Sequence, residues 1–217
     1  MLRALGGVLR DGDRVLVIDD NSPDGTGAAA DRLAAELGFV DVLHRPFREG
    51  LGPAYLAGFR RALDDGAELV LELDCDFSHD PADVPRLIAK AESGTDLVLG
   101  SRYVAGGSVA NWGLVRRAIS RGAAVYTALF LHMGVHDPTG GFKCFRRRVL
   151  ETIDLDAIGS QGYAFQIETT YRAKRAGFSV AEVPIRFADR EHGRSKMSRA
   201  IVLEAMWRVP LLRLRVR

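Results

Sequence analysis

The sequence predicts a single α/β domain in which helices cover both faces of a mostly parallel sheet. Apolar runs typical of buried strands alternate with segments of helical periodicity through the first half of the chain. Two of these runs end directly in acidic clusters, as strands do at the ligand-binding edge of such sheets. A length of 217 residues with 47% hydrophobic content is enough to bury one substantial core.

The elements of the first half follow from short apolar runs bounded by turn residues. Strands are expected at residues 15–18, 40–44, 69–73 and 97–100. Helices are expected between them at residues 26–37, 54–63 and 81–92. Gly38 stops the first helix, whereas Pro53 and Pro81 begin the other two, because proline suits the first turn of a helix.

The alternation changes after Ser101. One or two helices are expected at residues 112–133, a loop at 134–143, and helices at 147–153, 165–176 and 197–208. A strand at residues 180–187 is interrupted by Pro184. No linker or internal repeat divides the chain, so residues 1–217 are expected to form one domain with an elaborated second half.

Charge and cysteine content exclude several classes of protein. The net charge of +2 is too small to indicate nucleic-acid binding. Residues 186–217 carry nine Lys or Arg against three Asp or Glu, which suits phosphate or an anionic membrane, although a solvated face remains the simpler interpretation. Cys75 and Cys144 lack metal or redox spacing, which favours a reducing, cytoplasmic compartment.

No segment predicts a membrane span or an exported protein. The residues before Asp13 contain no continuous apolar core of the kind found in signal peptides. The most apolar stretch, residues 122–131, is too short to cross a bilayer. A soluble or peripheral protein is therefore expected.

The most informative motif is Asp74-Cys75-Asp76, which directly follows the third predicted strand. Paired carboxylates at the carboxyl edge of a sheet suit a hard cation such as Mg²⁺, and the cation in turn suits a diphosphate. Acidic residues also end many strands as turn formers and helix caps, and we interpret Asp80 in that way.

Other polar residues are expected at the same edge. Asp19 and Asp20 follow the first predicted strand and can accept hydrogen bonds from a ribose or a base, although residues 21–25 also read as an ordinary turn. Arg102 follows the fourth strand, with Arg116 and Arg117 soon after, and arginine can bind phosphate oxygens in pairs.

Two loops complete the candidate site. Residues 137–143 carry an acid, two glycines and a lysine, and glycine lets a backbone approach a ligand closely. A plain connecting turn is the alternative. Residues 190–196 are rich in phosphate donors such as Arg194 and Lys196, whereas His192 has no suitably spaced second histidine for zinc.

This series of motifs resembles the polyprenol-phosphate mannose synthases, also called dolichol-phosphate mannosyltransferases. They belong to the family 2 glycosyltransferases with the GT-A fold, and the resemblance extends from Val15 to about Ser198. The matching segments are VIDDNSPDGT (17–26), DCDFSHDP (74–81), GSRY (100–103), DPTGGFK (137–143), YAFQIE (163–168) and HGRSK (192–196). Single motifs are common in family 2, but the series is specific.

The resemblance implies transfer of mannose from GDP-mannose to a polyprenyl monophosphate, with inversion and with Mg²⁺ or Mn²⁺. It implies a nucleotide-sugar half at residues 15–103 and an acceptor half at 104–217, in a protein peripheral to the cytoplasmic membrane face and held there by its basic end or a separate anchor protein. It also implies the site residues. The residues that would contact the donor are Asp19, Asp20, Asp74, Asp76 and Lys196, and those that would bind the metal are Asp74 and Asp76. The acceptor phosphate would be bound by Arg102, Arg116, Arg117 and Arg194. The catalytic residues would be Asp76 and Arg102.

The sequence departs from the family pattern in two places. Family members begin with a strand that ends in a Pro-x-Tyr-Asn-Glu segment, whereas residues 1–9 resemble the helix that follows it. The sheet is therefore expected to lack its first strand. Ser78 stands where some relatives have a glutamine as a further metal ligand.

Alternative functions remain open on sequence alone. The nearest is a family 2 enzyme with another donor, such as UDP-glucose. A truncated, weakly active or non-catalytic nucleotide-sugar binder is the next, because of the missing strand. A phosphohydrolase with Asp74 as nucleophile fits poorly, because such enzymes place this motif on their first strand with a threonine after it.

Overall fold

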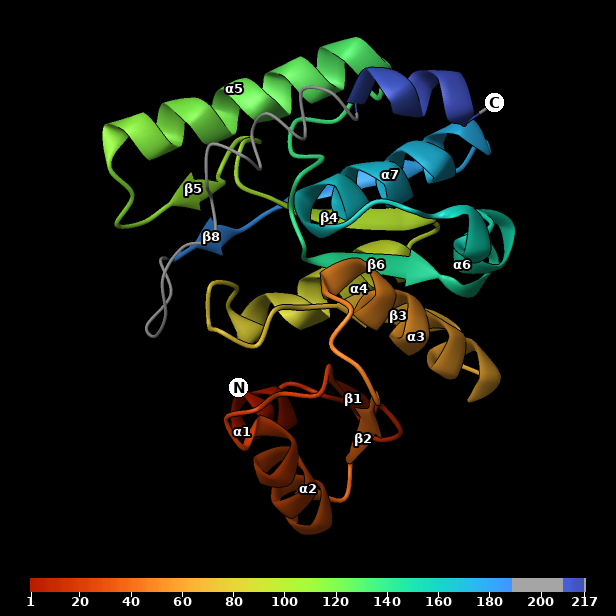
Figure 1. Cartoon of the computed structure of the whole chain (residues 1–217). Helices are drawn as coiled ribbons and strands as arrows, with labels where there is room; N and C mark the ends of the chain where they lie inside the picture. The colour runs from red at the N-terminus through yellow and green to blue at the C-terminus, as the bar shows by residue number, and fades with distance from the viewer. Residues whose placement is uncertain (189–208, 217) are drawn as a thin grey trace.

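Strands and helices of the computed structural model form layered α/β structure, described here for residues 1–188 and 209–216 (Figure 1). The strands are β1 (Val15–Asp19), β2 (Val40–His44), β3 (Leu69–Glu72), β4 (Leu97–Ser101), β5 (Ser108–Val109), β6 (Lys143–Arg146), β7 (Val180–Pro184) and β8 (Arg186–Phe187). The helices are α1 (Leu2–Gly6), α2 (Thr26–Leu37), α3 (Leu51–Asp64), α4 (Val84–Glu92), α5 (Leu114–Leu131), α6 (Arg147–Thr152) and α7 (Gly162–Arg175). Residues 209–215 are also helical.

The central sheet has the strand order β3-β6-β4-β7. β4 and β7 are parallel, whereas β6 runs antiparallel to both β3 and β4. A separate parallel pair joins β1 to β2, and a short parallel pair joins β5 to β8. Asp19 is the last residue of β1, whereas Asp74 and Arg102 follow shortly after β3 and β4 of the central sheet.

Helices pack on both faces of the sheet, as predicted. On β4, Leu97 and Leu99 belong to the buried cluster formed with α3, α5, α6 and α7, whereas Val98 belongs to the cluster formed with α1 and α4. Successive residues of a strand point to opposite faces, so one apolar run feeds both clusters. All of β4 is buried, which explains why it reads as a continuous apolar run.

The N-terminal region stands apart from the central sheet. Among the described residues, β1 pairs only with β2, and no strand joins it to β3. Leu5 of α1 is buried in the cluster beside α4, and Val15 of β1 and Leu71 of β3 pack partly against it. Figure 1 shows β1, β2, α1 and α2 together below the four-stranded sheet.

Most predicted elements are confirmed within a few residues. The helix at 26–37 and the strand at 40–44 have the predicted bounds, and Gly38 ends the helix in the left-handed conformation, with φ of 64°. α3 and α7 begin three residues earlier than predicted, and residues 114–131 form one continuous helix. The helix predicted at 197–208 lies outside the described residues.

The strand β6 was missed by the sequence-based prediction. The sequence predicts a loop at residues 134–143 and no element at 144–146, yet Lys143–Arg146 forms a strand between β3 and β4. Its sequence, Lys-Cys-Phe-Arg, has no strong strand pattern. Because a charged residue stands at each end, the sequence does not indicate that this strand lies in the middle of the sheet. Hydrogen bonds to strands far away in sequence decide its conformation.

Candidate active site

Asp74 and Asp76 lie directly after β3, at the edge of the central sheet, as predicted. Both side chains are half-buried, and Cys75 between them is exposed. Asp76 accepts a hydrogen bond from the backbone N–H of Ser78 at 3.0 Å, which turns the chain sharply after the motif. Phe77 in this turn has φ of 59°, an uncommon conformation for a bulky residue.

A tyrosine that the sequence did not single out fixes the position of Asp74. The hydroxyl of Tyr55, on α3, donates to Asp74 Oδ1 at 3.1 Å. Burial raises the pKa of Tyr55 well above its ordinary value, and the charge of Asp74 adds to the effect, so the phenol keeps its proton. On the other side Gly141 lies close to Asp74, since a Cβ added there would be 3.8 Å from Asp74 Oδ2.

Asp19 and Asp20 lie at the end of β1 and stabilise two neighbouring loops. Asp19 accepts from the N–H of Ser22 at 3.1 Å and lies 3.3 Å from a ring nitrogen of His44. Hydrogen bonds from Ser22 hold the pKa of Asp19 below its ordinary value. Asp20 accepts from the N–H of Gly50 at 2.8 Å and from Arg45, and so supports the loop before α3.

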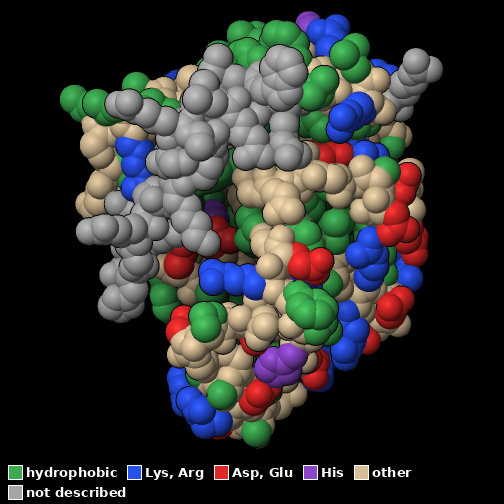
Figure 2. Space-filling view, viewed as in Figure 1, with side chains coloured by type: hydrophobic (Ala, Val, Ile, Leu, Met, Phe, Trp, Pro, Cys, Tyr) green, Lys and Arg blue, Asp and Glu red, His purple; other side chains and the backbone are tan. Residues whose placement is uncertain are grey.

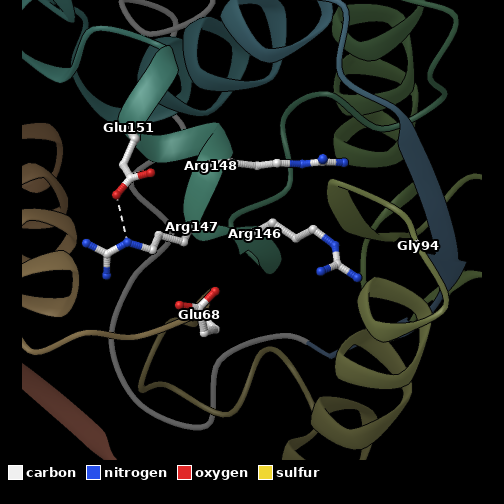
Figure 3. Close-up of a pocket in the computed structure, with 6 residues that line it drawn as sticks. All are labelled: Glu68, Gly94, Arg146, Arg147, Arg148 and Glu151. Atoms are coloured by element: carbon white, nitrogen blue, oxygen red, sulfur yellow. Dashed lines mark hydrogen bonds and ion pairs between the residues drawn. The ribbon is translucent and has the colours of Figure 1, made fainter.

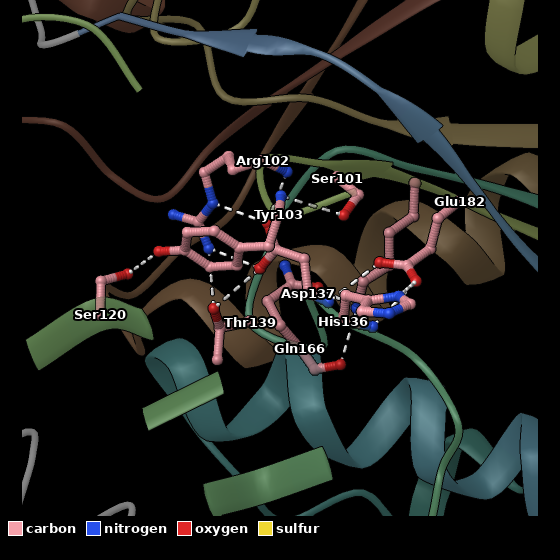
Figure 4. A network of polar contacts seen from close by, with 10 residues as sticks. Ser101, Arg102, Tyr103, Ser120, His136, Asp137, Thr139, Gln166 and Glu182 are labelled. Atoms are coloured by element: carbon pink, nitrogen blue, oxygen red, sulfur yellow. Dashed lines mark hydrogen bonds and ion pairs between the residues drawn. The ribbon is translucent and has the colours of Figure 1, made fainter. Parts of the chain in front are cut away.

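Arg102 is held in place by a buried acid, as Figure 4 shows. Its Nε donates to Asp137 Oδ2 at 2.7 Å and its Nη2 donates to Asp137 Oδ1 at 2.6 Å. Nη2 also donates to the hydroxyl of Thr139 at 2.8 Å. The side chains of Arg102 and Asp137 are 5% and 0% exposed, so the pair is shielded from water.

Each member of this pair keeps the other charged. Burial opposes both charges, but the Asp137 carboxylate outweighs it and raises the pKa of Arg102. Arg102 in turn lowers the pKa of Asp137, together with its own backbone N–H. No hydrogen bond from Arg102 Nη1 is found among the described residues.

Aromatic rings surround Arg102 and connect it to α5. The guanidinium lies 5.2 Å, 5.8 Å and 5.3 Å from the ring centroids of Tyr103, Trp112 and Phe187. Tyr103 donates to the hydroxyl of Ser120 on α5 at 2.7 Å. The buried His79 packs on Phe187 as well, and burial together with the nearby Arg102 lowers its pKa to about 4, so it is neutral at pH 7.

Arg116 and Arg117 lie in the first turn of α5. The guanidinium of Arg116 stacks over the Trp112 ring at 4.0 Å from its centroid. Arg117 donates to the carbonyl of Val109 at 2.9 Å. Since Trp112 also lies beside the guanidinium of Arg102, its ring connects Arg116 with Arg102.

A second buried pair lies behind Asp74. Glu72 and Lys143 are cross-strand neighbours on β3 and β6, and their Oε1 and Nζ atoms are 3.7 Å apart. Lys143 Nζ donates to the backbone oxygen of Gln166 at 2.7 Å, to its side-chain oxygen at 2.6 Å and to Thr169 at 3.1 Å. Burial raises the pKa of Glu72 to about 8 and lowers that of Lys143 to about 8. The network fixes β3, β6 and α7 together directly below the acidic motif.

A separate hollow at the opposite end of the strands holds three consecutive arginines, shown in Figure 3. Each has a structural partner within the fold. Arg146 donates to the carbonyl of Ala91 at 2.6 Å, Arg147 donates to Glu151 at 2.7 Å, and Arg148 donates to Asp96 at 2.7 Å. We therefore assign this cluster to stability and not to ligand binding.

The acidic motif fits a divalent cation by its chemistry. Asp74 and Asp76 offer carboxylate oxygens, and Mg²⁺ is commonly bound by one or two carboxylates with substrate phosphates and water completing the shell. In the described part of the chain, no group of three or more His, Cys, Asp or Glu side chains is placed to hold an ion. The pair therefore suits an ion that arrives with a diphosphate. Both cysteines are free.

Two predicted residues, Arg194 and Lys196, lie outside the described residues. Tyr55, Thr139 and Gln166 were missed as contributors to the site. Thr139 and Gln166 lie in motifs quoted from the sequence, but nothing in those motifs indicated their partners. Tyr55 is one aromatic residue in an amphipathic helix and carries no sequence signal of its own.

Comparison with known proteins gives matches over most of the chain. Residues 1–154 match the model of the family described as "Glycosyl transferase family 2". The chain is 51% identical over 196 residues to a polyprenol monophosphomannose synthase from Mycolicibacterium smegmatis, covering 90% of this chain and 74% of that protein. It is 48% identical over 192 residues to an undecaprenyl-phosphate mannosyltransferase from Micrococcus luteus, covering 88% of this chain and 79% of that protein.

A solved structure shares the fold. Glucosyl-3-phosphoglycerate synthase from Mycobacterium tuberculosis, solved with Mn²⁺, UDP-glucose and phosphoglyceric acid, superposes with a TM-score of 0.63 at 21% identity. The match covers 97% of this chain and 72% of that one. At this identity the likeness supports the GT-A type of fold alone.

Proposed function

Because this chain belongs to glycosyl transferase family 2 and is a glycosyltransferase, we propose that it transfers mannose from GDP-mannose to a polyprenyl monophosphate, with inversion at the sugar carbon. The observation that carries this substrate class is the 51% identity to a polyprenol monophosphomannose synthase over 196 residues. The arrangement of paired acids and arginines at one sheet edge supports it. Residues 15–103 would hold the donor and residues 104–217 the acceptor.

The donor half is proposed to use the acidic residues after β1 and β3. Asp74 and Asp76 would hold Mg²⁺ or Mn²⁺, which when bound withdraws charge from the donor diphosphate and so improves the leaving group. Asp19 and Asp20 would lie beside the nucleotide, where their hydrogen bonds to the backbone of Ser22 and Gly50 hold the neighbouring loops. Lys196 completes the donor contacts in this proposal.

The phosphate of the acceptor is proposed to be bound by arginines, one of which, Arg102, lies at the end of the donor half. Arg102 would offer Nη1 to a phosphate oxygen while Asp137 and Thr139 hold the rest of its guanidinium. Arg116, Arg117 and Arg194 would supply further positive charge. Arginine suits this role because its planar donors match phosphate oxygens.

The proposed reaction needs alignment more than proton removal. A phosphate oxygen of the lipid forms a bond to the sugar carbon while the bond from that carbon to the diphosphate oxygen breaks, so GDP leaves with the electron pair. Lipid phosphate is already anionic at neutral pH, and so no strong general base is required. A site in which arginines gather near the acidic motif fits such a reaction.

Because the proposed acceptor is a lipid, the enzyme would have to act at a membrane surface. Within the described residues, none of the helices is both long and apolar enough to span a bilayer. We propose that the enzyme is peripheral to the cytoplasmic membrane face, either through its own surface or through a separate anchor protein.

Transfer of labelled mannose tests the proposal. The purified protein is incubated with labelled GDP-mannose, polyprenyl phosphate and Mg²⁺ or Mn²⁺, and the labelled lipid is extracted and counted. Asp76→Asn retains the shape of the side chain but removes its charge, and we expect at least about a 100-fold loss of kcat, the usual scale for losing one electrostatic contact in a transition state. Asp80→Asn is the matched control, because Asp80 only caps the next turn by accepting from Ala82.

Several outcomes would overturn the proposal. Full activity in Asp76→Asn would remove the role of the acidic motif. Faster transfer from UDP-glucose than from GDP-mannose would reassign the donor. Calorimetric donor binding without turnover would identify a nucleotide-sugar binder.

A further inference from the structure

An acidic side chain lies almost enclosed on β7, the strand next to the one that precedes Arg102. Glu182 stands opposite Leu99 of β4, and its side chain is only 9% exposed. Positions on a covered strand are usually apolar, as at Val183, which joins a buried cluster. Among the described residues, no lysine or arginine forms an ion pair with Glu182. Other contacts must therefore offset the cost of burying this carboxylate.

These contacts come from the backbone of two consecutive residues, as Figure 4 shows. Glu182 Oε2 accepts from the N–H of His136 at 2.8 Å, and Oε1 accepts from the N–H of Asp137 at 2.9 Å. Nδ1 of the His136 ring also lies 2.8 Å from Oε2, although the ring itself is 67% exposed. Each carboxylate oxygen thus holds one backbone N–H, and hydrogen bonds to a charged acceptor are the stronger kind. Glu182 therefore fixes the backbone at Asp137.

Asp137 passes this constraint on to Arg102. In addition to its two bonds with the guanidinium, Asp137 Oδ2 accepts from the backbone N–H of Arg102 at 2.9 Å. One carboxylate therefore holds both the main chain and the side chain of Arg102. The same loop is fixed again at Phe142, whose carbonyl accepts from the N–H of Gly100 on β4 at 2.8 Å. The loop is thus attached to β7 through Glu182 and to β4 near Arg102.

We propose that Glu182 is a positioning residue for acceptor binding, because it holds the backbone of residues 136–137 and so sets where Arg102 meets the acceptor phosphate. This inference rests on the proposed function, in which Arg102 binds that phosphate. A carboxylate is needed at position 182, since two N–H groups face its two oxygens. A glutamine would turn its NH2 group toward one of these N–H groups, which would then lack an acceptor.

Steady-state kinetics of Glu182→Gln tests the proposal. In the mannose-transfer assay we expect KM for polyprenyl phosphate to rise about tenfold, the scale of one lost hydrogen bond that orients a substrate-binding group. KM for GDP-mannose, whose proposed contacts lie after β1 and β3, should change less than about twofold. Loss of folded protein alone would lower kcat and leave both KM values unchanged, so a rise in the acceptor KM separates positioning from stability.

Two variants serve as controls. His136→Ala removes the exposed ring but keeps both backbone bonds to Glu182. Glu151→Gln also removes one negative charge, from an exposed pair with Arg147 on α6. In Figure 2 Asp and Glu side chains are mixed with Lys and Arg side chains along the side of the molecule that carries α3 and α6, so one charge less there should matter little. An acceptor KM raised as much in either control as in Glu182→Gln would overturn the proposal.

A double-mutant cycle shows whether Glu182 acts through Arg102. Arg102→Lys keeps a positive charge but cannot form the same pair of bonds with Asp137. If Glu182 acts by holding Arg102, then Glu182→Gln should raise the acceptor KM much less in the Arg102→Lys background than in the parent. Equal effects in the two backgrounds would mean that Glu182 acts independently of Arg102, which contradicts the proposal.

Hydrogen exchange tests the same contacts without substrate. In Glu182→Gln the amides of residues 136, 137 and 102 should exchange faster than in the parent, whereas those of β2 should be unchanged. If this variant folds poorly, Glu182→Asp keeps the charge on a side chain one methylene shorter and should show the same changes to a smaller degree. Unchanged exchange at Arg102 in the folded variant would overturn the positioning role.

The positioning role and the proposed function fail in different ways. Absence of mannose transfer by the parent protein would overturn the proposed function, and exchange of the Arg102 amide would still decide whether Glu182 holds Arg102. Normal transfer by the parent, with an unchanged acceptor KM in Glu182→Gln, would overturn the positioning role alone.

Discussion

Buried charges in this protein are held by particular partners, and these contacts set the geometry of the site. Arg102 is almost fully enclosed, with two of its nitrogens bonded to Asp137. Lys143 is wholly buried, with three acceptors around Nζ and Glu72 nearby. A buried charge without its partner is strongly destabilising, so each of these residues depends on another that is far away in sequence.

The Arg102–Asp137 pair gives the first stability prediction. Asp137→Asn leaves the Arg102 guanidinium buried without a counter-charge, and we expect the free energy of unfolding to fall by about 3–5 kcal/mol. Asp65→Asn removes an acid from an exposed helical pair with Arg61, and it should cost less than about 1 kcal/mol. Urea denaturation at pH 7 measures both. Equal losses in the two variants would contradict the role assigned to burial.

Asp96 gives a prediction on pH. Burial alone would raise its pKa, but the N–H and hydroxyl of Ser179 and the guanidinium of Arg148 outweigh burial and hold the pKa below its ordinary value. A carboxyl with a lowered folded-state pKa stabilises the fold above its unfolded-state pKa of about 3.9, and this contribution is lost as the pH falls through the folded-state pKa.

The consequence is measurable in Asp96→Asn. This variant should be less stable than the parent at pH 7, and the difference should shrink as the pH is lowered below about 4. Urea denaturation at a series of pH values measures the difference. If the difference in unfolding free energy between parent and variant stayed constant down to the pH at which the protein unfolds, Asp96 would not be the titrating group.

Among the elements, helix α3 depends on close packing between its first turn and the segment before α7. Gly52 lies against the segment before α7, where an added Cβ would be only 2.6 Å from the backbone oxygen of Ser160. Backbone atoms cannot move aside as the end of a flexible side chain can. α3 carries Tyr55 toward Asp74, so the same approach also sets the distance between this helix and the acidic motif.

Alanine at Gly52 should therefore destabilise the protein. We expect Gly52→Ala to lower the free energy of unfolding by about 1–3 kcal/mol, the usual cost of overpacking. Gly122→Ala is the matched control, since Gly122 also lies in a helix but has nothing within 4 Å of an added Cβ. That change should be neutral or stabilising by up to about 1 kcal/mol. Thermal unfolding of both variants measures the difference in stability. If Gly122→Ala were the more destabilised variant, the close packing at Gly52 would not limit stability.

At the scale of the whole molecule, the two groups of strands differ in how well they are enclosed. β4 is buried along its length and pairs on both sides, whereas β1 is mostly half-buried and pairs only with β2 among the described residues. α3 links the groups, because Gly58 of α3 packs against Ile18 of β1 while Phe59 joins the cluster over the central sheet. A two-stranded unit has little stability of its own.

Hydrogen exchange should reveal this difference. We expect backbone amides of β1 and β2 to exchange faster than those of β4 and β6, because local opening of the smaller unit exposes less apolar surface. Mass spectrometry of peptides from residues 15–19, 40–44 and 97–101 measures it after labelling at neutral pH. Equal protection in all three segments would mean that the strands open only together.

Local patterns in the sequence were sufficient to predict the alternation of strands and helices. They also placed Asp19 at the end of its strand and Asp74 and Arg102 shortly after theirs. Apolar periodicity and glycine or proline at element ends depend only on neighbours in sequence, so they can be read directly. The family resemblance rested instead on the series of sequence motifs, and the comparisons confirm it.

Only the tertiary structure decided where β6 lies, that Lys143 meets Glu72, that Asp137 holds Arg102, and that one face of α5 is left exposed. Each of these depends on contacts between segments tens of residues apart. The type of a residue indicates that a buried charge needs a partner or that an apolar side chain tends to be buried. Only the packing of the whole chain determines which partner lies close enough to contact it.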